Sequence, residues 1–231
     1  MIKRYTENFI RKYKNRNFKF DDELTISMLV SFSLDKFISH LRSYKLLFLF
    51  RFTRFNFYGN SVKFRNLAKI KLGKWVELGD YVYLNGLGKG FLIIGDKTKI
   101  SAFSRVVVST SYNNLGEFIH IGNNVGIGEY ASIGGSGGVS IGDNTITGQY
   151  LSIHPENHNF QDINKLIKDQ GTTRSSIVIG QNCWIGAKVT VLAGVNIGDN
   201  CVIAAGSVVT KDIPSNSVSA GVPAKILKKR V

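Results

Sequence analysis

An aliphatic residue recurs at every sixth position over residues 177–210, and a glycine or alanine often follows it. A period of six fits neither the alternation of a β-strand nor the 3.6-residue period of an α-helix. Short fixed repeats are typical of solenoids, in which each unit buries its apolar residue only by stacking on its neighbours. Three such faces would make a triangular coil of about 18 residues. The recurring positions are Ile179, Ile185, Val191, Ile197, Ile203 and Val209.

The same period can be followed upstream, with interruptions. The coils begin near Val62, are irregular at first, and carry a small loop at 109–116; glycine-rich residues 134–138 lengthen one coil. The polar, aperiodic stretch 154–176 breaks the register, which returns at Ile179. A loop of about twenty residues inside a regular repeat is uncommon and usually functional. We therefore expect an N-terminal extension (1–60), a repeat domain (61–213) with the inserted loop 154–176, and a C-terminal tail (214–231).

The N-terminal extension is basic and has a weaker helical pattern. Residues 1–65 hold 14 Lys and Arg against 5 Asp and Glu, within a net charge of +14 for the chain. Residues 1–30 show no clear period, whereas 33–52 carry one apolar stripe at helical spacing, with Ser33 as the N-cap. This helix would either cover the open end of the solenoid or touch an anionic membrane surface as a basic amphipathic segment. Nucleic-acid binding fits the charge only superficially.

Composition excludes several other classes of protein. No stretch approaches the roughly 20 apolar residues of a membrane span, since the run at 46–50 is too short. Basic residues interrupt the N-terminus where a signal peptide would have its apolar core, so the sequence predicts a cytoplasmic protein. Two cysteines do not make a disulfide framework. Cys183 and Cys201 recur at the same place on adjacent coils, and we expect two small buried thiols because parallel side chains rarely meet the geometry of a bridge.

The C-terminal repeats resemble the hexapeptide-repeat acyltransferases, and most closely the O-acetyltransferases of galactosides, maltose and bacterial surface polysaccharides. The resemblance rests on Trp184-Ile-Gly186, on the run from Ala204 to Pro214, on Ala220-Gly-Val-Pro-Ala-Lys225, and on the polar loop with its histidines. It spans roughly residues 62–231 and does not include 1–60. It implies an all-β fold, a left-handed parallel β-helix, that is usually a homotrimer and uses acetyl-CoA without a metal.

Two histidines of the loop are candidates for the catalytic base. His154, which precedes a proline, looks like the His-Pro of the sugar acetyltransferases. In the galactoside enzymes the catalytic histidine follows the glycine of an Ile-Gly-Asp-Asn corner by sixteen residues, and this spacing from Gly142 leads to His158. The resemblance therefore favours His158, with His154 in reserve. A neutral imidazole would take the proton of a sugar hydroxyl as it attacks the thioester in a direct transfer. Two carboxylates could orient the imidazole, Glu156 and Asp162.

The remaining site residues follow from the C-terminal motifs of the family. Small residues along the coils would let the pantetheine arm lie close to the backbone, and lysines would pair with the phosphates of the coenzyme. Asn157 and Arg174, both in the loop, are candidates for contacts with the acceptor. The resemblance assigns coenzyme contacts to Trp184, Gly186, Ala187, Ala204, Ala205, Thr210, Lys211 and Lys225.

The acceptor is expected to differ from a simple galactoside. Gly128 and Ser136 stand where galactoside-type enzymes have an Asn and an Asp that hold the sugar, so we expect an O-acetyltransferase of a surface polysaccharide or its precursor. N-acetylation of a nucleotide-linked amino sugar is the alternative on the same fold. A metal-dependent hydratase would need three converging histidines, and we expect His40 and His120 to be surface or packing residues. A non-catalytic solenoid that only binds a partner leaves the loop histidines unexplained.

Overall fold

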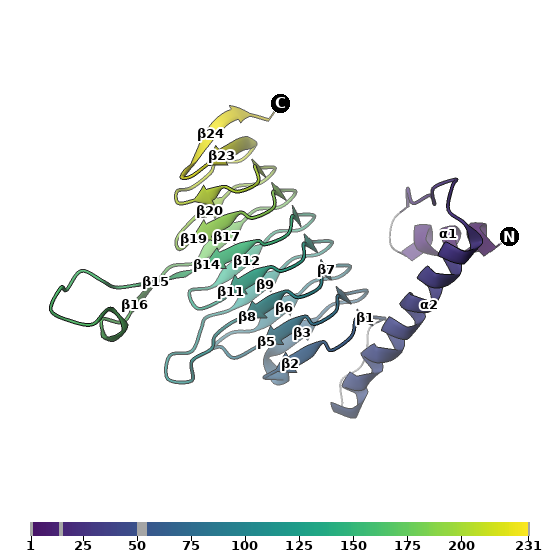
Figure 1. Cartoon of the computed structure of the whole chain (residues 1–231), viewed down its shortest axis with the longest axis horizontal. Coiled ribbons are helices and arrows are strands. Elements are labelled where there is room, and N and C mark those ends of the chain that lie inside the picture. Colours follow the sequence, from purple (N-terminus) through teal and green to yellow (C-terminus); the bar gives the residue numbers. More distant parts are fainter. Residues whose placement is uncertain (1, 14–15, 50–54, 231) are drawn as a thin grey trace. The chain divides into compact units, whose positions relative to one another are not determined.

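The computed structural model describes residues 2–13, 16–49 and 55–230, and the chain divides into two compact units, Met1–Phe57 and Tyr58–Val231. The N-terminal unit contains helices α1 (Ile2–Tyr13) and α2 (Ile26–Ser43) and a 3-10 helix, η1 (Tyr44–Leu49) (Figure 1).

Helix α2 begins earlier than the sequence pattern suggests. Thr25 is its N-cap, because the Thr25 Oγ1 accepts a hydrogen bond from the Met28 N–H at 3.2 Å. Ser33 lies inside the helix, where its hydroxyl donates to the Leu29 carbonyl at 2.8 Å. The assignment of Ser33 as N-cap is therefore wrong. The interpretation of residues 1–30 as lacking a period is wrong as well, because Ile2–Tyr13 form the amphipathic helix α1. Residues 50–52, the end of the expected helix, fall outside the described residues.

The apolar side chains of α2 are largely exposed. Leu34, Phe37 and Leu41 are 54%, 59% and 49% exposed. None of the helices that the structure describes combines the length and the apolar character needed to cross a membrane. His40 is a packing residue, since its ring stacks on Phe55 with the ring centroids 5.5 Å apart. Contact of this unit with a membrane surface stays a prediction.

The second unit is a parallel β-helix with three faces, A, B and C, each a sheet of short stacked strands (Figure 1). Face A consists of β1 (Phe57–Tyr58), β4 (Glu77–Leu78), β7 (Lys99–Ile100), β10 (Gly126–Ile127), β13 (Ile146–Thr147), β18 (Trp184–Ile185), β21 (Val202–Ile203), β23 (Ser217–Gly221) and β24 (Ala224–Lys229). Face B consists of β2 (Lys63–Arg65), β5 (Tyr83–Asn85), β8 (Arg105–Val107), β11 (Ser132–Gly134), β14 (Ser152–His154), β19 (Thr190–Leu192) and β22 (Val208–Val209). Face C consists of β3 (Ile70–Leu72), β6 (Leu92–Ile94), β9 (Ile119–Ile121), β12 (Val139–Ile141), β17 (Ile177–Ile179) and β20 (Asn196–Ile197).

The register of the strands matches the period of the sequence. Ile179 pairs with Ile197 and Ile185 with Ile203, so equivalent positions of these C-terminal coils are eighteen residues apart, whereas earlier coils are longer, as in the pairing of Lys63 with Tyr83. The inward side chains are almost completely buried and form the core; Ile185, Ile197 and Ile203 are 0% exposed. Asparagines turn the chain at a corner in the left-handed backbone region, as at Asn144, which has a φ of 59°. The periodic residues therefore specify the coil, because similar aliphatic side chains of successive coils stack on one another along the axis.

Two segments depart from the regular coil, and both contain more structure than expected. The stretch 154–176 forms an arm, in which β15 (Glu156–His158) pairs antiparallel with β16 (Thr172–Arg174) and a 3-10 helix, η3 (Ile167–Asp169), lies farther out (Figure 1). The tail also forms strands, since β23 continues face A in parallel with β21 and β24 folds back antiparallel onto β23. A third short 3-10 helix, η2 (Leu67–Lys69), lies between β2 and β3.

Candidate active site

Most of the residues singled out by the sequence lie along the two edges of face B or on the arm beside it. Each coil passes from face A to face B at one edge, here named the A–B edge, and from face B to face C at the other, the B–C edge. Outward side chains of face B fall into two columns along the coil axis. One column contains Tyr83, Arg105, Ser132 and Ser152, and the other, beside the B–C edge, contains Arg65, Asn85, Val107, Gly134 and His154.

Both candidate histidines lie at the base of the arm, on the B–C edge. His154 ends β14, and its Nε2 lies 2.7 Å from the Ser152 hydroxyl oxygen. His158 ends β15 opposite Thr172, and its imidazole has no hydrogen bond or ion pair among the described residues. Both histidine side chains are exposed. The geometry leaves His158 free to accept a proton from an acceptor, whereas His154 is already engaged with Ser152.

Neither of the carboxylates expected to orient the imidazole does so within the described residues. Glu156 forms an ion pair with Arg174, with 2.5 Å between Oε2 and Nε. Asp162 lies farther along the arm and pairs with Lys165 at 3.5 Å. The orientation of His158 therefore depends on the β15–β16 ladder and not on a carboxylate of the arm.

Arg174 joins the arm to the loop 109–116. Besides its bond to Glu156, its Nη1 donates to the Leu115 carbonyl at 2.7 Å and its Nη2 to the Asn114 carbonyl at 3.1 Å. The Arg174 side chain is only 18% exposed, and most of its donors are used within the protein. Asn157, the other candidate acceptor contact, is exposed on β15 opposite Thr173. Arg174 thus fixes the base of the arm, although it also lines the cavity described below.

The A–B edge is a wall of small residues packed at backbone contact. A Cβ on Gly186 would lie 2.4 Å from the Ala205 nitrogen, and a Cβ on Gly148 would lie 2.5 Å from the Ala187 nitrogen. Only glycine allows the coils to approach this closely at those positions. Of the predicted coenzyme residues, six belong to this edge or to the strands that lead to it: Trp184, Gly186, Ala187, Ala204, Ala205 and, on the terminal hairpin opposite Ala220, Lys225.

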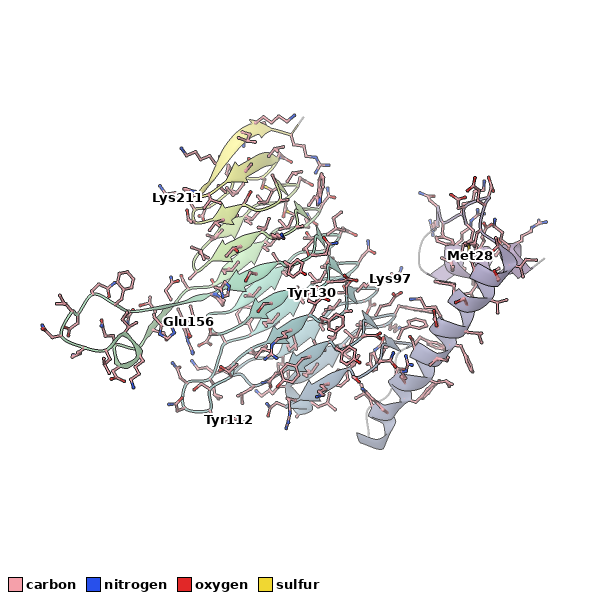
Figure 2. The ribbon with its side chains drawn as sticks, viewed as in Figure 1. Met28, Lys97, Tyr112, Tyr130, Glu156 and Lys211 are labelled. Carbon is pink, nitrogen blue, oxygen red and sulfur yellow. The ribbon has the colours of Figure 1, made fainter. Side chains whose placement is uncertain are left out.

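The other two predicted coenzyme residues lie at the B–C edge. Thr210 and Lys211 directly follow β22 and are both exposed; Lys211 is labelled in Figure 2. Leu192, at the same edge one coil earlier, comes five residues after Ala187, so face B separates the two edges by roughly 16 Å. The structure therefore divides the predicted site residues into two sets on opposite edges of one face.

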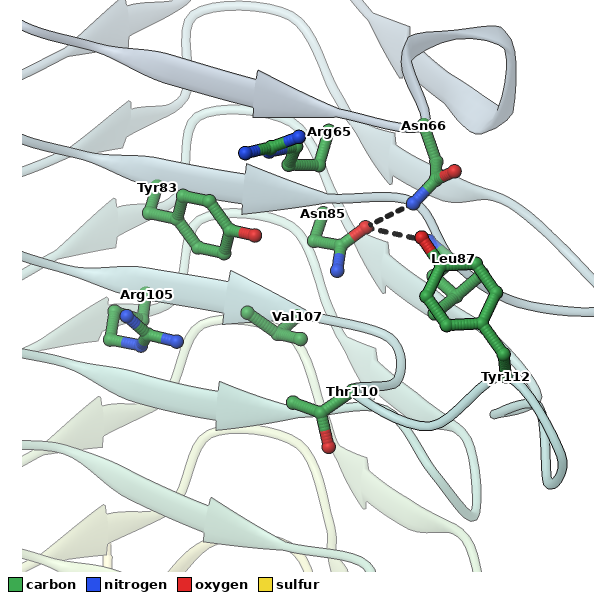
Figure 3. A pocket seen from close by; sticks show the side chains of 9 residues that line it. All are labelled: Arg65, Asn66, Tyr83, Asn85, Leu87, Arg105, Val107, Thr110 and Tyr112. Atoms are coloured by element: carbon green, nitrogen blue, oxygen red, sulfur yellow. Dashed lines mark hydrogen bonds between the residues drawn. The ribbon is translucent and has the colours of Figure 1, made fainter.

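A polar cavity of about 320 Å³ lies between the base of the arm and the loop 109–116. Gly134 lines this cavity, and a Cβ there would make only ordinary van der Waals contact, 3.4 Å from the Ile153 carbonyl oxygen. A second cavity of about 250 Å³ lies farther along face B, where Arg65, Tyr83 and Arg105 line it (Figure 3). Hydroxyl, amide and guanidinium groups surround both cavities: the first is lined by residues that include Arg105, Ser109, Thr110, Ser111, Ser132, Ser136, Glu156 and Arg174.

Most of these cavity residues were not identified from the sequence. The exceptions are Glu156, Arg174 and Ser136, the last being one of the two positions at which the resemblance predicts the loss of a sugar-holding residue. Gly128, the other such position, lies at the A–B edge under Gly148, where a Cβ would lie 2.4 Å from the Gly148 carbonyl carbon. The signal that could have found the cavity is the concentration of polar residues at outward positions of the irregular early coils, as at Tyr83 and Arg105.

Cys183, Cys201 and His120 lie apart from the two histidines of the arm. Cys183 and Cys201 are free and buried, which confirms the expectation of two buried thiols. Burial raises the pKa of the Cys183 thiol, and this disfavours a thiolate nucleophile. His120 lies on face C, packed against the Phe118 ring with the ring centroids 4.5 Å apart. Over the part of the chain that the structure describes, no three His, Cys, Asp or Glu side chains are grouped to hold a metal ion.

Comparison with known proteins finds a hexapeptide-repeat family and relatives that are named acetyltransferases. A family model described as a hexapeptide repeat of succinyl-transferase matches residues 176–211. The galactoside O-acetyltransferase of Escherichia coli is 40% identical over 51% of this chain and 57% of its own length. The protein named "Putative acetyltransferase YJL218W" of Saccharomyces cerevisiae is 33% identical over 71% of this chain and 84% of its own length. The chain spans about half the length of several curated relatives that it matches.

A solved structure agrees with the architecture. AntD, an N-acyltransferase from Bacillus cereus in complex with dTDP and 3-hydroxybutyryl-CoA, superposes with a TM-score of 0.52 at 17% identity, covering 82% of this chain and 89% of that chain. Together with the repeat family, this likeness confirms the left-handed parallel β-helix expected from the sequence.

Proposed function

Because the chain belongs to the hexapeptide-repeat acetyltransferases, we propose that it transfers an acetyl group from acetyl-CoA to a hydroxyl of a glycan, with His158 as the general base. The observation that carries this proposal is the position of His158. Its imidazole is unpartnered among the described residues and stands at the base of an arm that borders a polar cavity. Hydroxyl-lined cavities of this size suit a sugar unit better than an apolar acceptor.

The transfer would need few groups from the protein. The neutral imidazole of His158 takes the proton of the acceptor hydroxyl as its oxygen attacks the thioester carbonyl. The C–S bond then breaks, and the imidazolium returns its proton to the leaving thiolate of the coenzyme. The wall of small residues at the A–B edge would hold the pantetheine arm, and Lys211 and Lys225 would pair with its phosphates. No acyl-enzyme is required, which agrees with the burial of both cysteines.

We also propose that the complete site forms between two copies of the chain. A coenzyme lying along the wall of Ala187 and Ala205 would hold its thioester at the A–B edge, roughly 16 Å from the B–C edge of the same chain. A general base must come within hydrogen-bond distance, about 3 Å, of the proton that it takes. A neighbouring copy that places its His158 against this wall removes the gap. A homotrimer with three equivalent sites satisfies this requirement by cyclic symmetry.

The second candidate function is N-acylation of a nucleotide-linked amino sugar. It is favoured by the likeness of fold to AntD, whose structure holds dTDP together with an acyl-CoA. An amine is a better nucleophile than a hydroxyl, so this reaction depends less on a general base. O-transfer on a surface polysaccharide or its precursor remains our proposal because the cavity at the base of the arm is rich in groups that recognise sugars.

The test is release of the coenzyme thiol from acetyl-CoA, followed with oligosaccharides and with nucleotide-linked amino sugars as separate acceptors. Replacement of His158 by alanine should lower kcat by about 10²- to 10⁴-fold and leave the KM for acetyl-CoA nearly unchanged. Replacement of His154 by alanine is the matched control and should have a much smaller effect. A full rate in His158→Ala, or transfer only to amines, would contradict the proposed O-transfer.

A further inference from the structure

A cationic cavity lies on face B at some distance from the proposed catalytic histidine. Arg65, Tyr83 and Arg105 come from the successive strands β2, β5 and β8, and Figure 3 shows the Tyr83 ring between the two arginines. The Arg105 guanidinium lies 4.9 Å from the centre of the Tyr83 ring. The cavity measures about 250 Å³ and opens to solvent.

The positive charge in this cavity is not neutralised by the protein. No Asp or Glu is among the residues that line it. Neither Arg65 nor Arg105 forms an ion pair with any residue for which the structure gives a position, and both are exposed. Arginines that only make the surface more soluble can lie anywhere on it and need not line the same cavity. Two of them around one cavity without a carboxylate are suited to bind an anion through charge-assisted hydrogen bonds.

The floor of the cavity is fixed in advance. The Asn85 side chain is buried, and its Oδ1 accepts hydrogen bonds from the Asn66 Nδ2 at 2.8 Å and from the Leu87 N–H at 3.1 Å. Its Nδ2 donates to the Ser109 carbonyl at 3.2 Å. One amide therefore ties three separate turns together beneath the arginines. A floor held in this way keeps the backbone of the cavity in one arrangement, so less of it must be ordered when a ligand binds.

The cationic cavity is continuous with the cavity beside the arm. Arg105, Val107 and Thr110 line both. Arg105 is two strands away from Ser152, through Ser132, and this corresponds to about 10 Å at the usual strand spacing. Arg65 is two strands farther, about 19 Å from the level of His154. A short oligosaccharide laid along face B would reach from the base of the arm to both arginines.

We propose that these arginines bind an anionic group of the acceptor, a carboxylate or a phosphodiester, carried at some distance along the glycan from the acetylated hydroxyl. The proposal rests on the function proposed above in taking the acceptor as a glycan, and it adds the chemical class of that glycan. Lys63, on the same strand as Arg65, adds to the positive potential on this face and would favour encounter with a polyanion.

The experiment measures binding without acetyl-CoA, so that it does not depend on catalysis. The probes are a tetrasaccharide of alternating glucuronate and N-acetylglucosamine, its carboxyl-reduced counterpart, and a tetramer of glycerol phosphate, each titrated by calorimetry. We expect the anionic probe that matches the acceptor to bind at least tenfold more tightly than the neutral one. Arg65→Gln and Arg105→Gln should each reduce that affinity by about tenfold, while Lys99→Gln, on face A of the same coil as Arg105, should not.

The outcomes separate this proposal from the proposed function. Equal binding of all three probes, or equal affinities in the two arginine variants and in Lys99→Gln, would overturn the anionic site even if acetyl transfer to neutral sugars is found. Arginine-dependent binding without any acetyl transfer would support the anionic site and would refute the proposed acetyltransferase activity. Preference for glucuronate or for glycerol phosphate identifies the source of the charge, and circular dichroism of each variant shows whether the fold is retained.

Discussion

Replacing Arg174 with alanine should release the base of the arm while the solenoid stays folded. Arg174 is the only described residue that bonds both the arm and the loop 109–116 through one side chain, by its contacts to Glu156, Leu115 and Asn114. Its removal leaves the Glu156 carboxylate without its cation, and that side chain is only 27% exposed. The coils beneath do not depend on this contact, because their inward aliphatic residues are buried independently of it.

The size of the effect follows from these contacts. Breaking a fully buried pair by removing one partner costs about 3–5 kcal/mol, and exposed pairs contribute about 0–1 kcal/mol. Because Arg174 and Glu156 are partly exposed, we expect about 2–4 kcal/mol, including the two carbonyl bonds. The loss applies to local opening of the arm, not to global unfolding. At 1.36 kcal/mol per tenfold change, backbone amides of β15 and β16 should exchange roughly 30- to 900-fold faster.

Hydrogen exchange resolved by residue measures this opening directly. Lys165→Ala is the matched control, because the Lys165–Asp162 pair is in the same arm but its side chains are 67% and 41% exposed. It should change exchange by less than about fivefold. Exchange at 156–158 and 172–174 that is no faster in Arg174→Ala than in the control would refute the role assigned to Arg174. Acceleration throughout the coils would refute the separation of arm and solenoid.

Three further predictions concern the two edges of face B and the thiols. Lys211→Ala should raise the KM for acetyl-CoA by about tenfold with little change in the KM for the acceptor, measured by initial rates, since a charge-assisted contact to phosphate is lost. Chains carrying His158→Ala can be co-assembled with chains carrying Ala205→Trp, and the activity of the mixture measured. If each site takes His158 from one chain and the Ala205 wall from its neighbour, roughly a quarter of the sites in a randomly mixed trimer should be active. A site made within one chain would give no recovery. Cys183 and Cys201 should not react with a disulfide reagent until the protein is unfolded, because both are buried and burial raises the pKa of Cys183; rapid labelling of the native protein would contradict this.

The sequence predicted the coils because their period records which side chains point inward. The spacing of Ile179 and Ile197 is enough to place one above the other, since each can be buried only by its equivalent on the next coil. The pairing of Glu156 with Arg174 leaves no such record, because an exposed polar ladder shows no apolar alternation. The start of α2 is not predicted for a related reason: both Thr25 and Ser33 are residue types that cap helices, and residue type even favours Ser33, whereas the helix begins after Thr25.

The residues of the proposed site also differ in whether the repeat pattern of the sequence reveals them. The wall residues Gly186 and Ala205 belong to the repeat, so the motif located them on one edge. The cationic residues Arg65 and Arg105 occupy outward positions, which the packing of the core leaves unrestricted. Their common cavity becomes visible only when strands about twenty residues apart are stacked in register.

The A–B edge carries a second feature that agrees with a site formed between copies. Tyr81, Phe103, Tyr130 and Tyr150 stack along it, with successive ring centroids 5.1, 5.1 and 5.0 Å apart. Each has a φ between 57° and 60°, a left-handed conformation that costs a non-glycine residue roughly 1–2 kcal/mol. These rings nevertheless remain about half exposed, with values of 45% to 55%.

Strain of this kind persists where surrounding contacts compensate for it. Besides the ring–ring contacts of about 0.5–1.5 kcal/mol each, the backbone N–H of each ring residue donates a hydrogen bond to a carbonyl of the preceding coil, as Tyr130 does to Ala102 at 3.1 Å. Lys188 and Gly206 continue the same backbone position beyond Tyr150, directly beside Ala187 and Ala205. The aromatic stack and the proposed coenzyme wall thus form one continuous edge. A neighbouring copy that brings His158 to the wall would also cover the rings, so a single interface would account for the half-exposed stack and for the roughly 16 Å between the two halves of the site.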